Sequence, residues 1–182
     1  MTTTGRSHAA LEHVEAPGSM LSHTAARALA VLRISTGFVF LWAFLDKTFG
    51  FGYATPSAKS WINGGSPTKG FLSSVDVGPF QGFFHNIAGT HFANWAFMLG
   101  LLGIGTALTF GVGMRFAAVA GGLLYVLMWS VVLPPANNPI IDEHILGAIT
   151  VVALALTNAG DTWGLGRWWT RTEVVERYPA LR

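Results

Sequence analysis

The apolar residues of this chain are gathered into four long blocks instead of being spread along amphipathic stripes. Each block has about the length that an α-helix needs to cross a bilayer, and charges are nearly absent inside it. The blocks cover residues 25–48, 92–110, 115–133 and 140–157. Lipid offers no partner for free backbone N–H and C=O groups, so such blocks fold as membrane-crossing helices. The sequence therefore predicts an all-α integral membrane protein with a four-helix bundle.

Composition narrows the class further. Only 11% of the residues are charged, about half the fraction of a soluble domain, so residues 25–162 are expected to form one membrane domain. There is no cysteine, which excludes disulfides, thiol redox pairs, thiolate-bound iron–sulfur clusters and covalently attached c-type haem. Any redox role thus needs a bound cofactor or a partner subunit. The arginines are scattered singly, which excludes a nucleic-acid partner.

The distribution of arginine predicts the orientation. The first block is too long for a signal peptide and has no cleavage site after it, so it is expected to remain as a span. Arginines gather on one side of the blocks, at Arg6, Arg27, Arg115, Arg167, Arg171, Arg177 and Arg182. This side is expected to face the cytoplasm, with a flexible tail over residues 1–24. Lys47, Lys59 and Lys69 lie on the opposite side and run against this assignment.

Residues 49–91 are too long for a turn and too aromatic for a disordered linker. Pro56, Pro67 and Pro79 each stand at a plausible first helical position. Phe80, Phe83, Phe84 and Ile87 then recur at helical spacing. We therefore expect a folded extracytoplasmic cap between the first and second helices.

Small residues predict close helix packing. They stand at small-xxx-small spacing in the second and third blocks, at Gly100, Gly103, Gly105, Ala117, Ala118, Gly121 and Gly122. At the other end of the chain, residues 163–182 mix tryptophan, valine and arginine. That pattern predicts an amphipathic cytoplasmic tail that anchors to the membrane surface.

Two ionisable residues of the first block, Asp46 and Arg33, need partners. Asp46 opposes the dipole at the end of its helix, so it either pairs with Lys47 or belongs to a site. A guanidinium at Arg33 needs an acceptor inside the membrane, either Asp161 or the carbonyls at a helix end. Arg33 is thus either a structural clamp between the first and fourth helices or a contact for a lipid or quinone head group.

The fourth block begins with a cluster of polar residues. Asn138 as N-cap, Pro139 at the first helical position and acids in the first turn are ordinary helix-start chemistry. They do not explain His144, which is expected to face the bundle interior and to exchange a proton beside the carboxylate of Asp142. No metal site is expected, because Asp142 and His144 are two residues apart and would point to opposite sides of a helix.

Two further histidines lie on the outer side. Taken singly, His85 and His91 are polar surface residues. Together with Asp46, Lys47, Asp142 and His144, they place most of the ionisable chemistry other than arginine at one mouth of the bundle.

Several of these segments resemble the DoxX/DoxD family. The resemblance lies in residues 32–37, 40–47 and 61–72 and in the pair Asp142 and His144. It implies a four-helix bacterial membrane protein, related to the small subunit of thiosulfate:quinone oxidoreductase. It brings no settled catalytic residues. Phe44 and Leu45 replace a glycine that members often carry, and the link between the third and fourth blocks is short.

The leading hypothesis is a subunit of a quinone-linked membrane oxidoreductase with a pocket at the outer mouth. Catalytic candidates are Asp46, Asp142 and His144, and cofactor-binding candidates are Arg33, Trp42, Lys47, Trp61, His85 and His91. The alternative is a non-enzymatic accessory or assembly subunit of a larger membrane complex. A small-solute carrier is a third possibility, although no inverted repeat is evident. The expected partners are membrane lipid and either other subunits or further copies of the chain.

Overall fold

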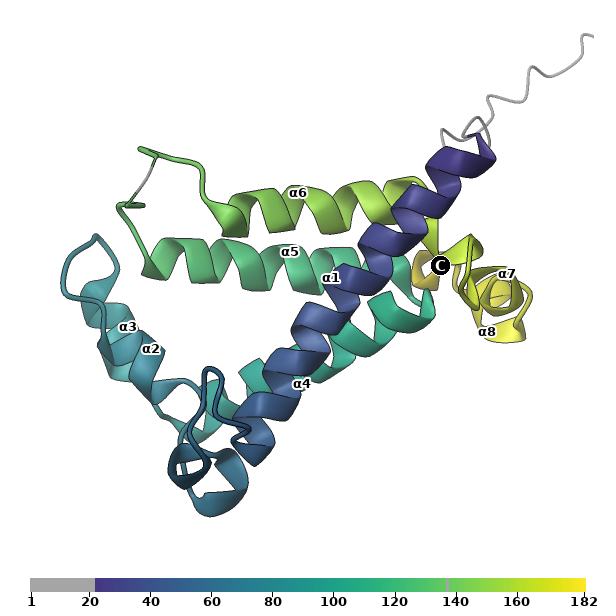
Figure 1. Ribbon diagram of the computed structural model, residues 1–182. Helices are drawn as coiled ribbons and strands as arrows, with labels where there is room; N and C mark the ends of the chain where they lie inside the picture. Colours follow the sequence, from purple (N-terminus) through teal and green to yellow (C-terminus); the bar gives the residue numbers. More distant parts are fainter. Residues whose placement is uncertain (1–21, 137) are drawn as a thin grey trace, which may run out of the picture.

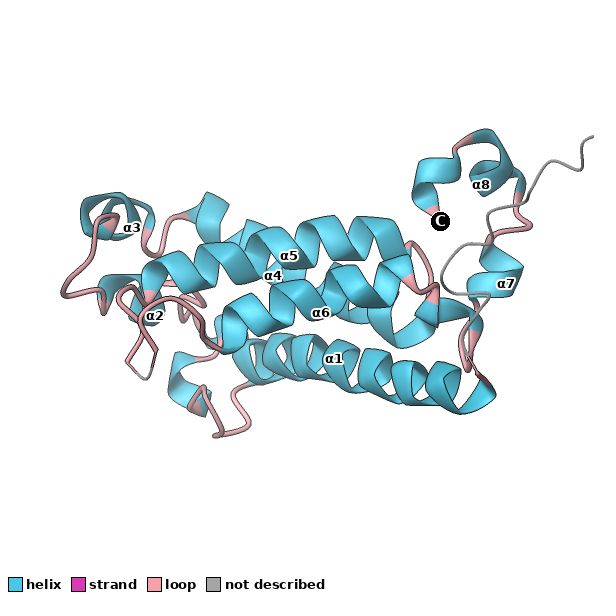
Figure 2. Cartoon of the chain, turned by 90° about the horizontal axis from the view of Figure 1, so that it is seen from above, coloured by secondary structure: helices cyan, strands magenta, loops and turns pink. Residues whose placement is uncertain are grey.

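In the computed structural model, residues 22–136 and 138–182 are described, and they form helices and loops without a strand (Figure 2). Among the described residues, three helices are long and apolar enough to cross a membrane: α1 (His23–Phe49), α4 (His91–Phe110) and α5 (Met114–Val131). Their ends lie within two residues of the first three predicted blocks. Most of the predicted flexible tail, residues 1–21, lies outside the described residues.

The fourth block is shorter than predicted. Helix α6 (Glu143–Leu156) has 14 residues, or about 21 Å of helix, against a hydrocarbon core of about 30 Å. It begins three residues late because residues 140–142 are not helical. A crossing by α6 therefore remains a prediction.

The helices begin and end at recognisable signals. The side chains of Ser22 and Thr90 accept hydrogen bonds from backbone N–H groups in the first turns of α1 and α4, as N-cap residues do. Both helices end at a glycine in the left-handed conformation, Gly50 and Gly111, which a side chain would disfavour.

The long helices are arranged as two pairs. Figure 1 shows α1 lying along α4, and α5 lying along α6. The core between them contains Phe40, Met98, Leu108, Val151 and Leu154. The outward faces expose large apolar side chains, including Phe38, Val39, Phe116, Val119, Leu146 and Ile149. Apolar faces of this extent are typical of helices that meet lipid.

Glycine sets how closely α1 and α4 approach each other. A Cβ atom on Gly105 would lie 2.8 Å from the backbone nitrogen of Leu41, and one on Gly37 would lie 2.7 Å from that of Thr109. The small-residue prediction is confirmed at Gly105 and at Gly121, which packs against Ile104. It is wrong at Gly103 and Gly122, which face open space.

This difference gives a matched pair of variants. Gly105→Ala is expected to lower the free energy of unfolding by about 1–3 kcal/mol, because the added methyl group must push α1 away. Gly103→Ala adds the same methyl group in open space and is expected to leave stability unchanged or raised by up to about 1 kcal/mol. Thermal unfolding of both variants in the same detergent checks this. Equal melting temperatures would contradict the close approach.

The 49–91 segment forms only short helices and turns, and its role as an extracytoplasmic cap remains a prediction. It contains two 3-10 turns and two helices: η2 (Ser57–Lys59), η3 (Trp61–Asn63), α2 (Lys69–Ser73) and α3 (Gln81–Ile87). Pro56, Pro67 and Pro79 precede these elements by one or two residues instead of occupying the first helical position. Phe84 and Val75 of this segment pack on Val131, so the segment covers the end of α5.

The C-terminal part is not one helix. After η4 (Ala159–Asp161), the predicted tail forms α7 (Gly166–Trp169), α8 (Glu173–Arg177) and η5 (Pro179–Leu181). It folds back on the bundle: Trp169 Nε1 donates a hydrogen bond to the Leu181 carbonyl at 2.7 Å, and the Arg115 N–H donates to the Arg182 carbonyl at 3.0 Å.

Candidate functional site

Arg33 is completely buried. Its Nε donates to the Ala159 carbonyl at 3.1 Å and its Nη1 to the carbonyls of Leu108 and Thr109 at the end of α4. Its Nη2 donates to the carbonyls of Thr162 and Trp163 at 3.3 and 3.0 Å. All five guanidinium N–H groups are therefore used, since arginine has five donors. Asp161 is not the acceptor, because its carboxylate pairs with Arg182 at 3.5 Å. The expectation of helix-end carbonyls is met.

The surroundings of Arg33 are built from glycine. A Cβ atom on Gly111 or Gly164 would lie 3.0 Å from a guanidinium nitrogen. The adjoining loop holds Asn158 and Trp163 at positive φ angles of 49° and 51°, a costly conformation for residues with side chains. Arg33 thus ties α1 to α4 and to the loop after α6, with no donor left for a head group. We assign it to the fold and not to a ligand site.

Asp46 is also buried, and its partners are backbone groups. Its carboxylate accepts hydrogen bonds from the N–H groups of Tyr53 and Ala54 at 3.4 and 3.0 Å. The chain can turn back to make these contacts because Gly50 ends α1 in the left-handed conformation. Hydrogen bonds from N–H groups are the compensation that a carboxylate at a helix C-terminus requires.

Lys47 does not pair with Asp46. Its ammonium lies 5.9 Å from the centre of the Phe97 ring on α4, a cation–π contact. Within the described residues, no carboxylate lies at ion-pair distance from Lys47.

The two candidate tryptophans lie in aromatic groups. Trp42 stacks on Phe51 and meets the edge of Tyr53, so it covers the same loop that binds Asp46. Trp61 contacts Trp95 on α4, with 4.7 Å between ring centres.

Asp142 and His144 contact each other directly. His144 Nδ1 lies 2.8 Å from Asp142 Oδ2. The other carboxylate oxygen, Oδ1, accepts hydrogen bonds from the N–H groups of His144 and Ile145 at 3.0 and 3.1 Å. Asp142 is therefore the N-cap residue of α6 and the partner of the histidine at the same time.

This geometry corrects two predictions. Asn138 is not the N-cap, because its side chain accepts from the N–H groups of Ile140 and Ile141 in a turn before the helix, and Pro139 lies outside the helix. Asp142 and His144 do not point to opposite sides, because Asp142 has extended backbone angles (φ −129°, ψ −171°) and lies outside the helical turn. The sequence-based argument against a metal ion relied on those opposite directions, so it no longer holds. One ligand atom from each of Asp142, Glu143 and His144 lies within 4.8 Å of the others.

Asp142 precedes α6, and its environment favours the charged form. Burial works against ionisation, but the hydrogen bonds from the His144 side chain and from the Ile145 N–H outweigh it, and the pKa of Asp142 is lowered. The carboxylate is therefore ionised at neutral pH, and an ionised carboxylate only accepts hydrogen bonds. Nδ1 of His144 must then carry the proton, which leaves Nε2 as the group that can exchange one.

The ring of Tyr125 adjoins His144, and the ring of Phe40 adjoins Tyr125. The Tyr125 ring on α5 lies 6.4 Å from the imidazole, centre to centre, and Phe40 on α1 lies 5.2 Å from Tyr125. Tyr125 fits against α6 because residue 147 is glycine: a Cβ atom there would lie 2.5 Å from the ring carbon that bears the hydroxyl. The imidazole of α6 thus lies at the edge of an aromatic pair formed by Tyr125 of α5 and Phe40 of α1.

The two outer histidines lie elsewhere. The His85 ring nitrogen Nε2 is 2.9 Å from the Val75 carbonyl, which holds α3 against the preceding loop. His91 is exposed in the first turn of α4.

The candidate residues therefore fall into separate places. In Figure 1 the last turn of α1 lies beside α4, whereas α6 begins beside the end of α5. Asp46 and Lys47 belong to that last turn of α1. Among the described residues no hydrogen bond or ion pair joins the pair Asp46 and Lys47 to the pair Asp142 and His144. Among the described residues, the predicted convergence at one mouth therefore includes no direct polar contact between these two pairs.

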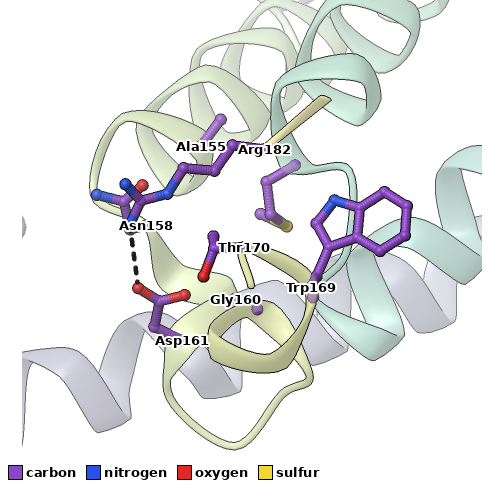
Figure 3. A pocket seen from close by; sticks show the side chains of 10 residues that line it. Ala155, Asn158, Gly160, Asp161, Trp169, Thr170 and Arg182 are labelled. Carbon is purple, nitrogen blue, oxygen red and sulfur yellow. Dashed lines mark hydrogen bonds and ion pairs between the residues drawn. The ribbon is translucent and has the colours of Figure 1, made fainter. Parts of the chain in front are cut away.

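A small hollow lies at the opposite end of the bundle, where Asp161 and Arg182 pair across it (Figure 3). Its walls come from the turn between α4 and α5, η4 and the C-terminal residues, including Gly111, Met114, Asn158, Trp169 and Thr170. No residue proposed for the site from the sequence lines it.

Sequence reasoning missed two groups. Tyr125 was not singled out, although it stands one helical turn from Gly121 and Trp129 on α5. Asn94 was also missed: its Oδ1 accepts from Ser66 Oγ, Thr68 N and Thr68 Oγ1 at 3.0, 3.2 and 2.7 Å, which fastens the 49–91 segment to α4. A polar asparagine inside an apolar block was the signal for the second group.

No family model matches this chain, and neither curated proteins nor solved structures provide a match.

Proposed function

We propose that this chain is a multi-pass integral membrane subunit of a quinone-linked oxidoreductase complex, with its proton-exchanging site at the start of α6. The observation that carries the proposal is the 2.8 Å contact between His144 Nδ1 and Asp142 Oδ2, beside the ring of Tyr125, which in turn contacts Phe40. The resemblance of the sequence to the DoxX/DoxD family supports the same function. By the distribution of arginine, we infer that this site lies on the outer side of the membrane and that both termini lie in the cytoplasm. The family resemblance implies that this membrane is a bacterial plasma membrane.

The residues fit a quinone in two respects. A quinone head group is a flat ring with carbonyl oxygens, and the site offers aromatic rings beside an imidazole whose Nε2 makes no hydrogen bond to another described residue. When bound, a quinone supplies the redox chemistry, since its reduction to quinol takes up two electrons and two protons. His144 would hold one of these protons at Nε2 and pass it on, while Asp142 keeps the imidazole oriented.

Electrons must come from elsewhere. The chain has no cysteine, so the electrons come either from a bound cofactor or from a partner subunit. The proposal takes the second source, which makes the chain one subunit of a complex.

The proposal is tested by the quinone content of the purified protein. We expect the full chain, extracted from membranes in mild detergent, to retain stoichiometric quinone in solvent extracts. His144→Ala is expected to lose most of it, because the hydrogen-bonding group is removed. Glu143→Gln, a change of an exposed neighbour, is the matched control and should retain it. A folded wild-type chain without quinone would refute the function.

A second candidate is an accessory subunit without chemistry of its own. It is favoured by the fact that Arg33 and Asp46, two of the predicted site residues, are occupied by backbone groups. Such a subunit would copurify stably with its partner, contain no quinone, and tolerate replacement of His144 without loss of the partner's activity.

A further inference from the structure

The segment after α6 exposes aromatic and basic side chains together. Trp163 and Trp168 are 60% and 62% exposed, and Leu165 between them is also exposed. Arg167 and Arg171 are exposed on the same short stretch of chain. We call Trp163, Leu165, Arg167, Trp168 and Arg171 the C-terminal surface.

The C-terminal surface is held rigidly to the bundle. The Trp163 carbonyl accepts a hydrogen bond from Arg33 Nη2 at 3.0 Å, and the Leu165 N–H donates to the Phe110 carbonyl at 2.8 Å. Trp163 keeps its positive φ of 51° through these contacts. The backbone is thus tied to Arg33 of α1 and to the end of α4, while the Trp163 side chain remains exposed.

The charges of this surface are available to a ligand. Arg167 uses only Nε, which donates to the Asp161 carbonyl at 3.0 Å, so its two terminal nitrogens make no bond to described residues. The Asp161 carboxylate is taken by Arg182. Glu173 and Glu176 are the nearby acids and lie on α8, after Arg171.

We propose that the C-terminal surface binds anionic phospholipids at the membrane boundary. The proposal rests on the membrane location of the chain but not on quinone chemistry. Tryptophan favours the depth of the lipid head groups, and the planar guanidinium of arginine matches a phosphate with two parallel hydrogen bonds. The surface follows α6 directly in the chain, so a bilayer that surrounds the helices ends where these side chains are exposed.

The test places the full chain in nanodiscs of phosphatidylcholine and phosphatidylglycerol. Native mass spectrometry then identifies the lipids that stay bound to the protein after it is released from the nanodisc. We expect the wild type to retain phosphatidylglycerol in preference to phosphatidylcholine. Each arginine near an anionic surface contributes about fivefold, so Arg167→Gln with Arg171→Gln should lower that preference about 25-fold. Arg171→Gln alone, which removes no internal hydrogen bond, should lower it about fivefold.

The matched control removes two exposed positive charges at the other end of the bundle, by Lys59→Gln with Lys69→Gln. It should keep the preference. An unchanged preference in the arginine variants, or an equal loss in the lysine control, would overturn the proposal. The proposal would also be overturned if the arginine variants changed from dimer to monomer without a change in bound lipid. That result would assign the surface to contact with a second copy of the chain. If the purified wild-type chain stayed soluble without detergent, that result would refute the membrane location on which this proposal rests.

Discussion

Arg33→Gln is expected to lower the free energy of unfolding by about 4 kcal/mol or more, a loss near the upper end of what single substitutions cause. The side chain is fully buried and donates to five carbonyls from α4 and the loop after α6. Hydrogen bonds to a charged group contribute about 1.5–3 kcal/mol each, and glutamine offers only two donors. The remaining carbonyls would be left unpaired in a closed interior.

The measurement is the melting temperature in detergent at one fixed scan rate. For a chain of this size, the loss corresponds to a decrease of about 8–16 °C. Lysine offers three donors, so the melting temperature of Arg33→Lys should lie between those of the wild type and the glutamine variant. Arg27→Gln removes an exposed arginine on the same helix and should change stability by less than about 0.5 kcal/mol. If Arg33→Gln melted at the same temperature as the wild type, the prediction would be wrong. The five carbonyls would then have found other hydrogen-bond donors.

Much of the fold follows from apolar block length. The three long helices end within two residues of their blocks, because lipid-spanning length and the absence of charge leave few other solutions. The partner of Arg33 was also within reach of the sequence. A guanidinium inside a membrane needs acceptors, and the open carbonyls at a helix end supply them.

The start of α6 could not be read correctly from the sequence. Asn138 with Pro139 is a strong helix-start signal, but Asn138 closes a turn and Asp142 caps the helix. The side-chain directions of Asp142 and His144 were judged by helical geometry. That geometry does not apply to an N-cap residue, whose backbone is extended.

The sequence also could not predict which of the candidate site residues lie close together in the fold. Membrane topology places Asp46 and His144 at one end of the molecule, but it does not say which helices pair. Because α1 packs on α4 and α6 on α5, the two residues are held apart, and the chain turns back on Asp46 through Tyr53 and Ala54. Tyr125 joins His144 only because Gly147 leaves room for its ring.

The pair formed by Asp142 and His144 is open to one decisive substitution. Asn is as good an N-cap residue as Asp, so Asp142→Asn should preserve the start of α6. It replaces an ionised acceptor with an amide, and the amide no longer requires the proton to be on Nδ1 of His144. Proton exchange at Nε2 would then fail even though the helix remains intact.

The quinone turnover of the purified complex that contains this chain, measured with bound quinone quantified in the same samples, tests the site most directly. General acid–base catalysis contributes about 10²–10⁴-fold, so Asp142→Asn should lower turnover at least about a hundredfold while quinone remains bound. Glu143→Gln should show the same quinone turnover as the wild type. A chelator should leave the turnover of both proteins unchanged, which distinguishes proton exchange from a role for a metal ion. Wild-type turnover by Asp142→Asn would contradict the assignment of this site.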